Sequence, residues 1–197
     1  MAPVSSPSRP RPEAVRLVAT VDDGRARNAV SPGSFEEIYV RHAAYVAGLV
    51  GRVIGRNHEV PDVVQDVFLI AHRRLSGVRD PGAVRAWLGR IAVREASRRL
   101  RWRRLRLFLQ PARSIEPDLV AADGADAELR PLVALLYASL DRLPARERVP
   151  WVLRYLLGEP LDTVAELAGC SIATVKRRIA AAERMLRPIL GAHEEDE

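Results

Sequence analysis

From Ser34 onward, the first half of the chain repeats apolar residues at every third or fourth position, which places them on one face of an α-helix. Ser34 and Glu37 have the spacing of a capping box, which predicts the start of a first helix. Pro61 suits the first turn of a second helix, and Asp80 followed by Pro81 is the start signal for a third. The predicted apolar faces are Phe35, Ile38, His42, Tyr45, Leu49 and Val53; Val63, Val64, Val67, Phe68, Ala71 and Leu75; and Val84, Trp87, Leu88 and Ile91.

The second half of the chain has the same kind of pattern. Apolar residues at helical spacing predict one helix around Leu136 and another around Trp151. A short helix over residues 162–168 and a longer helix over about 172–190 complete this unit. The apolar faces of the first two are Leu129, Leu132, Val133, Leu136 and Leu140, and Trp151, Val152, Tyr155 and Leu156.

No stretch alternates apolar and polar residues as a strand does, so the sequence predicts an all-α fold. We expect two small helical domains, over residues 34–105 and 127–190. Residues 106–126 lose the periodicity and contain Pro, Gly and acidic residues, which predicts a flexible linker. Residues 1–33 are predicted to be a disordered tail and residues 191–197 an acidic one.

Residues 162–179 have the features of a helix-turn-helix. Ala165 is small enough for a close helix crossing, Gly169 tolerates the positive φ of a sharp turn, and Ser171 can cap the second helix. The start of that second helix would present its polar side chains to the major groove of DNA. The other interpretation is a plain helical hairpin with a solvated basic face. The candidate DNA-binding residues here are Ser171, Thr174, Lys176, Arg177 and Arg178.

Charge strengthens the nucleic-acid interpretation. The 197 residues include 31 basic and 25 acidic ones, a net charge of +6, and all basic residues except Lys176 are arginines. Arginine forms bidentate contacts with phosphates and base edges. Six arginines fall within residues 98–106, which indicates a phosphate-binding surface rather than a solvated helix end. Trp102, within this run, could stack on an unpaired base, but a tryptophan at helical spacing more often lies in the core, and we expect that here.

Other classes of function find no support in the sequence. No nucleophile–base pair or phosphate-binding glycine loop is present, so we expect no catalytic residues and no cofactor. Cys170 is alone and the four histidines lack metal-ligand spacing, so we expect no metal site. The chain has no apolar run of membrane-spanning length and no signal-peptide core, which predicts a cytoplasmic protein that is not an enzyme.

Two blocks of motifs give the chain a specific resemblance. The first block resembles region two, and the second region four, of bacterial RNA polymerase sigma factors of the extracytoplasmic function (ECF) group. Together they span about residues 34–190 and occur in the family's order across a linker of suitable length. The first block is FEEIY at 35–39, DVVQDVF at 62–68 and AWLGRIA at 86–92; the second is LDRLPARER at 140–148, LRY at 153–155, VAELAG at 164–169 and TVKRRI at 174–179.

The resemblance implies a promoter-specificity subunit that binds core RNA polymerase, recognises and melts promoter DNA, and initiates transcription. It implies that Asp62, Gln65 and Asp66 contact the polymerase, and that the helix over residues 172–186 reads the minus-thirty-five element. Many members bind an inhibitory anti-sigma protein, although no motif in this chain indicates one. The resemblance implies that the loop over residues 76–81 and the helix over residues 84–104 melt and read the minus-ten element. The candidate residues for this element are Arg79, Arg94, Arg98, Arg99, Arg101 and Trp102.

The chain departs from the family pattern at several positions. Arg94 and Arg98 stand where the family usually has Asn and Asp, so the bases read there do not carry over. Pro150 falls at a mid-helix position, so that helix should be kinked or should begin near Pro150. Pro160 replaces a usual capping Ser.

Two alternative functions remain open at this point. A stand-alone regulator could bind duplex DNA through residues 162–186 and use residues 34–105 for sensing or dimerisation. The second alternative is a helical protein that binds other proteins and has a basic surface. Failure to bind any DNA would favour this alternative over both the sigma factor and the regulator.

Overall fold

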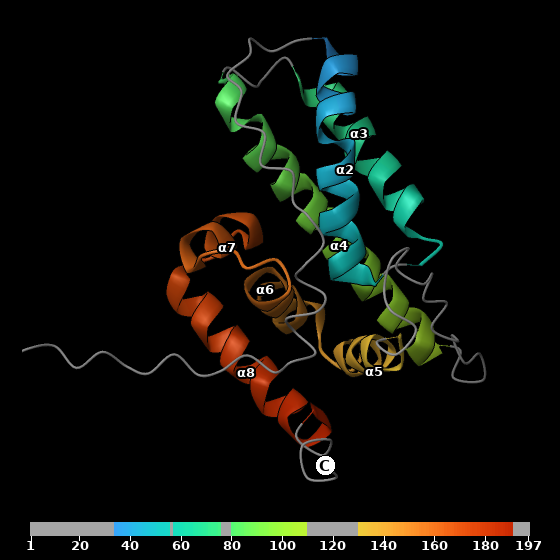
Figure 1. Ribbon diagram of the computed structural model, residues 1–197, viewed down its shortest axis with the longest axis vertical. Helices are drawn as coiled ribbons and strands as arrows, with labels where there is room; N and C mark the ends of the chain where they lie inside the picture. The colour runs from blue at the N-terminus through green and yellow to red at the C-terminus, as the bar shows by residue number, and fades with distance from the viewer. Residues whose placement is uncertain (1–33, 56, 76–79, 110–129, 191–197) are drawn as a thin grey trace, which may run out of the picture.

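The computed structural model describes residues 34–55, 57–75, 80–109 and 130–190, and within these ranges it contains seven α-helices, one short 3-10 helix and no strand (Figure 1). The all-α prediction is therefore confirmed for the described residues. The predicted terminal tails, most of the predicted linker and Arg79 lie outside them.

Helix α2 (Phe35–Ile54) begins and ends where the apolar pattern predicts. The Ser34 hydroxyl accepts a hydrogen bond from the backbone N–H of Glu37 at 3.4 Å, which is the N-terminal half of the expected capping box. Gly55 ends the helix with φ of 85°. The second half of α2 is buried almost all round, because helices from both halves of the chain pack against it.

Helices α3 (Val60–Arg74) and α4 (Val84–Leu109) pack against α2 and against each other. The expected start signal at Asp80 is real but opens a 3-10 turn, η2 (Pro81–Ala83), in which Asp80 Oδ1 accepts from Gly82 N at 2.8 Å. Helix α4 has 26 residues and continues to Leu109, past the predicted domain end at 105. It is therefore about 39 Å long at 1.5 Å per residue.

The second half folds into α5 (Arg130–Asp141), α6 (Ala145–Tyr155), α7 (Leu161–Ala168) and α8 (Ile172–Leu190). Helix α6 begins at Ala145 and contains Pro150 in its interior, so the alternative that this helix begins near Pro150 is wrong. Pro160 occupies the N-cap of α7 and provides no side-chain hydrogen bond, as its replacement of a capping Ser implied.

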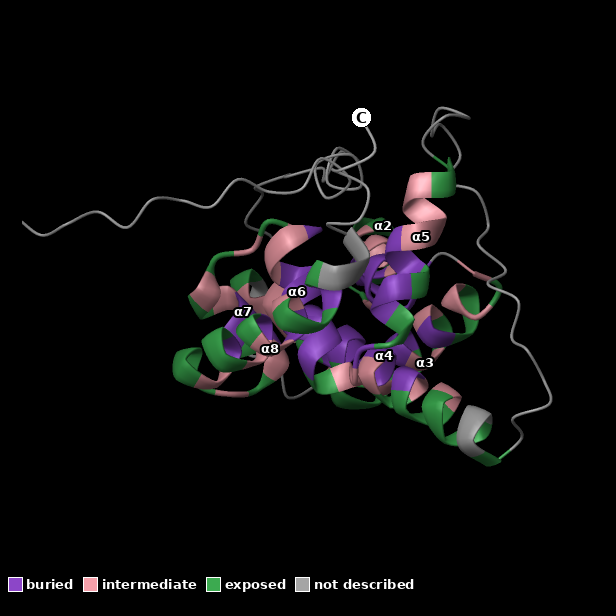
Figure 2. Ribbon diagram, turned by 90° about the horizontal axis from the view of Figure 1, so that it is seen from below, coloured by how far each residue is buried: buried purple, intermediate pink, exposed green. Residues whose placement is uncertain are grey.

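The two helical units pack against each other, which the sequence analysis did not anticipate. Helices α6 and α7 contact α4, and α6 also contacts the end of α2. Buried residues of both units form one continuous apolar cluster, and Figure 2 shows buried segments of α4 and α6 where the units meet.

The C-terminal end of α2 is the polar centre of this contact. A helix leaves its last four carbonyl groups without partners in the helix. Here Tyr137 Oη donates to the carbonyl of Arg52 at 3.4 Å, Arg148 Nε to that of Val53 at 2.7 Å, and Arg103 Nη1 to that of Ile54 at 2.8 Å.

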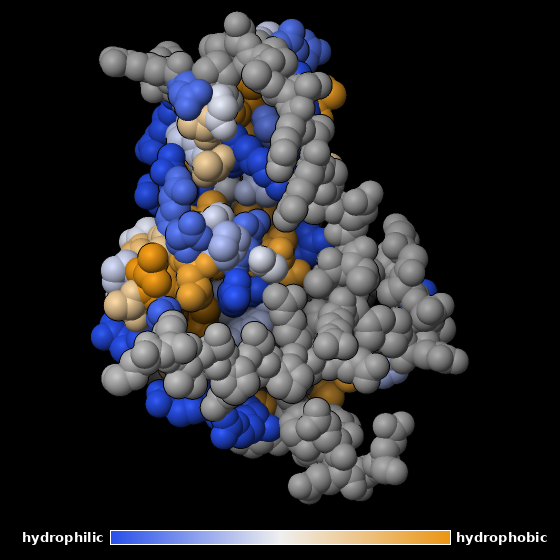
Figure 3. Space-filling model, turned by 60° about the vertical axis from the view of Figure 1, so that its left-hand side comes forward, coloured by the Kyte–Doolittle hydropathy of each residue, from blue (hydrophilic) through white to orange (hydrophobic). Residues whose placement is uncertain are grey.

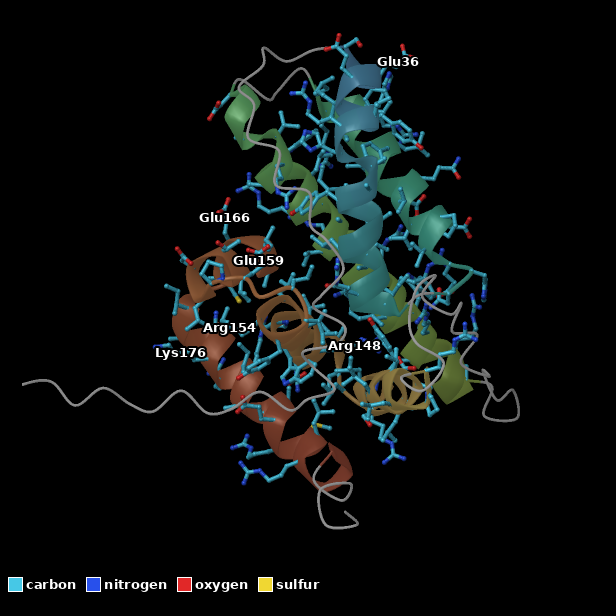
Figure 4. All side chains as sticks on the ribbon, viewed as in Figure 1. Glu36, Arg148, Arg154, Glu159, Glu166 and Lys176 are labelled. Carbon is cyan, nitrogen blue, oxygen red and sulfur yellow. The ribbon has the colours of Figure 1, made fainter. Side chains whose placement is uncertain are left out.

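Arg148 is the most deeply buried of these donors, with 1% of its surface exposed. Burial lowers the pKa of its guanidinium, while the ion pair with Asp141 opposes that shift. Because α6 carries Arg148 and α2 carries its carbonyl partner, this side chain ties the second unit to the first (Figure 4).

A glycine substitution tests the turn between α7 and α8. Gly169 has φ of 62°, and a Cβ added there would meet nothing within 4 Å, so an alanine would suffer only the backbone strain. We expect Gly169→Ala to lower the free energy of unfolding in urea by about 1–2 kcal/mol. Gly169→Asn should lower the free energy of unfolding less than Gly169→Ala does, because asparagine tolerates the left-handed conformation better than alanine. Equal stability of the alanine variant and the parent chain would contradict this account.

Candidate nucleic-acid interface

Helices α7 and α8 form the predicted helix-turn-helix. Gly169 adopts the left-handed conformation, and the N–H of Cys170 donates to the Ala165 carbonyl at 3.0 Å, which closes the end of α7. Ser171 Oγ accepts from Thr174 N at 3.2 Å and so caps α8. The expected apolar contact is also present, because Val164, Ala165, Leu167, Val175 and Ile179 are all buried.

The polar residues at the start of α8 are not equally available. Ser171, Lys176 and Arg177 are exposed, and Figure 4 shows Lys176 on the outer side of α8, away from α4. Thr174 is half-buried with its hydroxyl 3.0 Å from Ser171 Oγ, and half-buried Arg178 donates to Cys170 Sγ at 3.6 Å. Lys176 and Arg177 are therefore the cations of this set that can reach a DNA surface without breaking a described contact.

The arginine-rich part of α4 is divided into two groups by the helix geometry. One group faces α3 and is held in ion pairs. Arg98 contacts Glu95 at 2.6 Å and Asp66 at 3.1 Å, while Arg99 lies 3.6 Å from Glu59 and 3.8 Å from Asp62. Arg103 pairs with Glu59 as well.

The other group faces outward. Arg94, Arg101 and Arg104 are exposed, and no ion pair joins any of them to another residue in the described ranges. Since they are seven and three residues apart, they share one face of α4. Figure 3 brings the α7–α8 side of the molecule forward and shows hydrophilic side chains above and below a smaller apolar patch on it.

Trp102 does not lie in the core. Its exposed fraction is 59%, so the expectation that it packs inside is wrong. Leu105 and Leu109 are exposed too, at three and seven residues beyond it. The three side chains make an apolar strip on α4 beside the outward-facing arginines, because the helix extends past the unit against which its first half packs.

The predicted polymerase-binding residues lie on one outer face of α3. Asp62 and Gln65 are exposed and Asp66 is half-exposed. Asp62 and Asp66 are the ion-pair partners of Arg99 and Arg98, so the two predicted surfaces are adjacent. Leu69, which the sequence analysis did not assign to this face, is 48% exposed one turn further along.

Arg90 is a further residue that the sequence analysis did not select, and Arg104 was included only as part of the run over residues 98–106. Arg90 lies four residues before Arg94, so the periodicity used for the apolar positions could have identified it. Among the described residues, no cluster of His, Cys, Asp or Glu could hold a metal ion, and none of the helices is long and apolar enough to cross a membrane.

Comparison with known families accounts for both units. Residues 38–106 match the family model for sigma-70 region 2, and residues 134–186 match the model for sigma-70 region 4. The two matches coincide with the helices that carry the arginine-rich face and the helix-turn-helix.

Curated relatives and solved structures agree with these matches. The chain is 31% identical to the ECF RNA polymerase sigma-E factor of Escherichia coli K12, over 74% of this chain and 81% of the relative. It is 28% identical to that of Haemophilus influenzae, over 78% and 85%.

The fold is similar to that of the sigma factor RpoE solved with the anti-sigma factor NepR from Bartonella quintana, with a TM-score of 0.61, 20% identity, and coverage of 80% of this chain and 96% of that one. It is also similar to CnrH solved with the cytosolic domain of CnrY, with a TM-score of 0.54, 25% identity, and coverage of 91% and 96%. On this evidence the chain belongs to the sigma-70 family, as a member of its ECF group of bacterial RNA polymerase sigma factors.

Proposed function

We propose that the chain gives RNA polymerase its promoter specificity through three separate surfaces: α3 docks on core polymerase, α4 binds the minus-ten element, and α8 binds the minus-thirty-five element. The observation that carries this assignment is the pair of open basic faces, one on each helical unit. Two DNA-binding units in one chain make promoter affinity depend on their joint geometry.

At the upstream element, α8 enters the major groove by its N-terminal end. Lys176 and Arg177 are exposed there and can reach base edges or phosphates, and the capped start of the helix orients them. Thr174 and Arg178 contribute only after their contacts with Ser171 and Cys170 are exchanged for DNA.

At the downstream element, Arg94, Arg101 and Arg104 bind phosphates, and the exposed ring of Trp102 stacks on a base of the melted strand. Stacking on an aromatic ring contributes about 1–3 kcal/mol per base, which offsets part of the cost of unpairing. Arg98 and Arg99 position α4 through their ion pairs with Asp66 and Glu59, and they contribute less to DNA binding than the outward-facing arginines do.

On α3, Asp62, Gln65 and Asp66 form a polar docking surface for core polymerase, and the exposed Leu69 adds an apolar contact to it. An anti-sigma protein is a further partner of this chain in our proposal. Support comes from the two similar structures, each of which was solved as a complex.

The decisive experiment combines purified core polymerase with the full chain and sequences the transcripts made on genomic DNA. Initiation at defined positions supports the proposal. A chain that binds DNA but leaves core polymerase without specific initiation would instead be a stand-alone regulator.

Removing outward-facing charges from α4 should weaken promoter binding. We expect Arg101→Gln and Arg104→Gln each to lower the slope of log affinity against log salt by about one, because each loses one phosphate contact. Arg99→Gln should change the slope less, because its guanidinium already faces Glu59 and Asp62. The measurement is holoenzyme binding to a promoter over a salt series.

Arg142→Gln, an exposed arginine directly after α5, is the matched control, since it removes the same charge from the other helical unit. Equal slopes for Arg142→Gln and Arg101→Gln would show that net charge, rather than this face, sets the affinity.

Lys176→Ala should alter sequence preference at the upstream element alone. Loss of a good base contact reduces discrimination by about 1–3 kcal/mol, so the preferred base should lose roughly tenfold or more of its advantage. The measurement is transcription from a promoter library with both elements randomised, followed by sequencing. Arg187→Ala, an exposed arginine near the other end of α8, should leave the preference unchanged. A preference that moved only at the downstream element would show that α8 is wrongly placed.

A further inference from the structure

The outward face of α4 extends one turn beyond the residues assigned to it. Arg90, Arg94, Ser97 and Arg101 follow one another at intervals of four, three and four residues, so they lie in one row along the helix. Arg90 is about 6 Å along the axis from Arg94, at 1.5 Å per residue. A nucleic-acid backbone that follows this row from Arg101 to Arg94 would meet Arg90 next.

In the packed arrangement a carboxylate from the other helical unit occupies this position. Arg90 Nη1 lies 3.1 Å from Glu166 Oε1 on α7, with 46% and 51% of the two side chains exposed. Figure 4 shows Glu166 on the side of α7 that faces α4. A carboxylate offers a guanidinium the same kind of anionic oxygen acceptors that a phosphate does.

Helix α7 approaches α4 too closely for DNA to pass between them here. A Cβ added at Gly89, next to Arg90, would lie 2.8 Å from Leu167 Cδ2 and 2.7 Å from Tyr45 Oη. Leu167 is buried in this contact, one residue after Glu166. The packing of the two units therefore places Glu166 against Arg90 at the start of the row, while Arg94 and Arg101 are exposed without an ion pair in the described ranges.

We propose that Arg90 is a further phosphate-binding residue of the α4 face, and that Glu166 takes the place of the phosphate when the two helical units are packed together. Packing and DNA binding at Arg90 then exclude each other. The inference rests on the proposed function, since it needs α4 to be a nucleic-acid surface. Binding of a phosphate at Arg90 therefore requires α7 to move away from α4, and the half-exposed ion pair itself opposes that movement only weakly.

The test measures binding of the free full chain to a mixed-sequence DNA duplex with a central unpaired bubble, by fluorescence anisotropy over a salt series. We expect Glu166→Gln to bind about two- to fivefold more tightly than the parent chain, the range that corresponds to breaking an exposed ion pair. The slope of log affinity against log salt should become steeper by about one, because Arg90 gains a phosphate.

Asp162→Asn is the matched control. It lies on the same helix, removes the same charge, and keeps an oxygen that can accept from Thr163 N as Asp162 does at 2.9 Å. We expect its slope to stay at the parent value. Equal DNA affinities and equal salt slopes for Glu166→Gln and Asp162→Asn would overturn the inference, since the gain in affinity would then reflect the net charge of α7.

A double-mutant cycle with Arg90→Gln identifies the residue that gains the contact. In the Arg90→Gln background, Glu166→Gln should no longer tighten binding or steepen the slope. A gain that persists without Arg90 would place the effect of Glu166 within the helix-turn-helix and overturn the inference.

Transcription by core polymerase with the same variants separates this inference from the proposed function. If the parent chain directs initiation at defined positions while Glu166→Gln binds DNA like Asp162→Asn, only the inference fails. If the parent chain directs no initiation, both fail.

Discussion

The last turn of α2 is the point on which the arrangement of the chain depends. Its carbonyl groups have no hydrogen-bond donors within the helix, and because they are buried they cannot accept hydrogen bonds from water instead. Donors from α4, α5 and α6 satisfy the carbonyls of Arg52, Val53 and Ile54. One helix end thus fixes the long arginine-rich helix α4 of the first unit and two helices of the second.

Arginine has two distinct roles in this protein, and the acidic residues decide which one each side chain takes. Glu59, which is largely buried just before α3, forms ion pairs with Arg99 and Arg103. These two arginines therefore stabilise the packing of α4 against the start of α3. Arg94, Arg101 and Arg104 have no such partner in the described ranges and face outward. A run that reads as one basic block is therefore structurally two surfaces, because successive arginines on a helix point in different directions.

Periodicity was sufficient to predict the helices and the helix-turn-helix, because caps, turns and apolar spacing are local properties. The positive φ at Gly169 and the cap at Ser171 are examples. Trp102 was mispredicted because its exposure depends on how far α4 extends beyond its packing partners. The ion pairs of Arg98 and Arg99 depend on where α3 lies, and the contact between Arg148 and Val53 joins residues 95 positions apart. Local pattern contains no information about such distant pairs.

The contact between Arg148 and the end of α2 is formed in the packed arrangement and has to be broken in the proposed promoter-bound arrangement. Elements named minus-ten and minus-thirty-five are about 25 base pairs apart, or roughly 85 Å along the duplex at 3.4 Å per pair. Units that touch through α4 and α7 cannot each reach its own element on straight DNA at that separation, so the contact at α2 has to open.

Arg148 has the chemical properties expected of a contact that can open. Its Nη2 has no hydrogen-bond partner among the described residues, and burial lowers its pKa. A desolvated charge that is only partly satisfied contributes little net stability. Opening returns that charge to water, and the recovered solvation energy offsets part of the cost of exposing the apolar contact between the units.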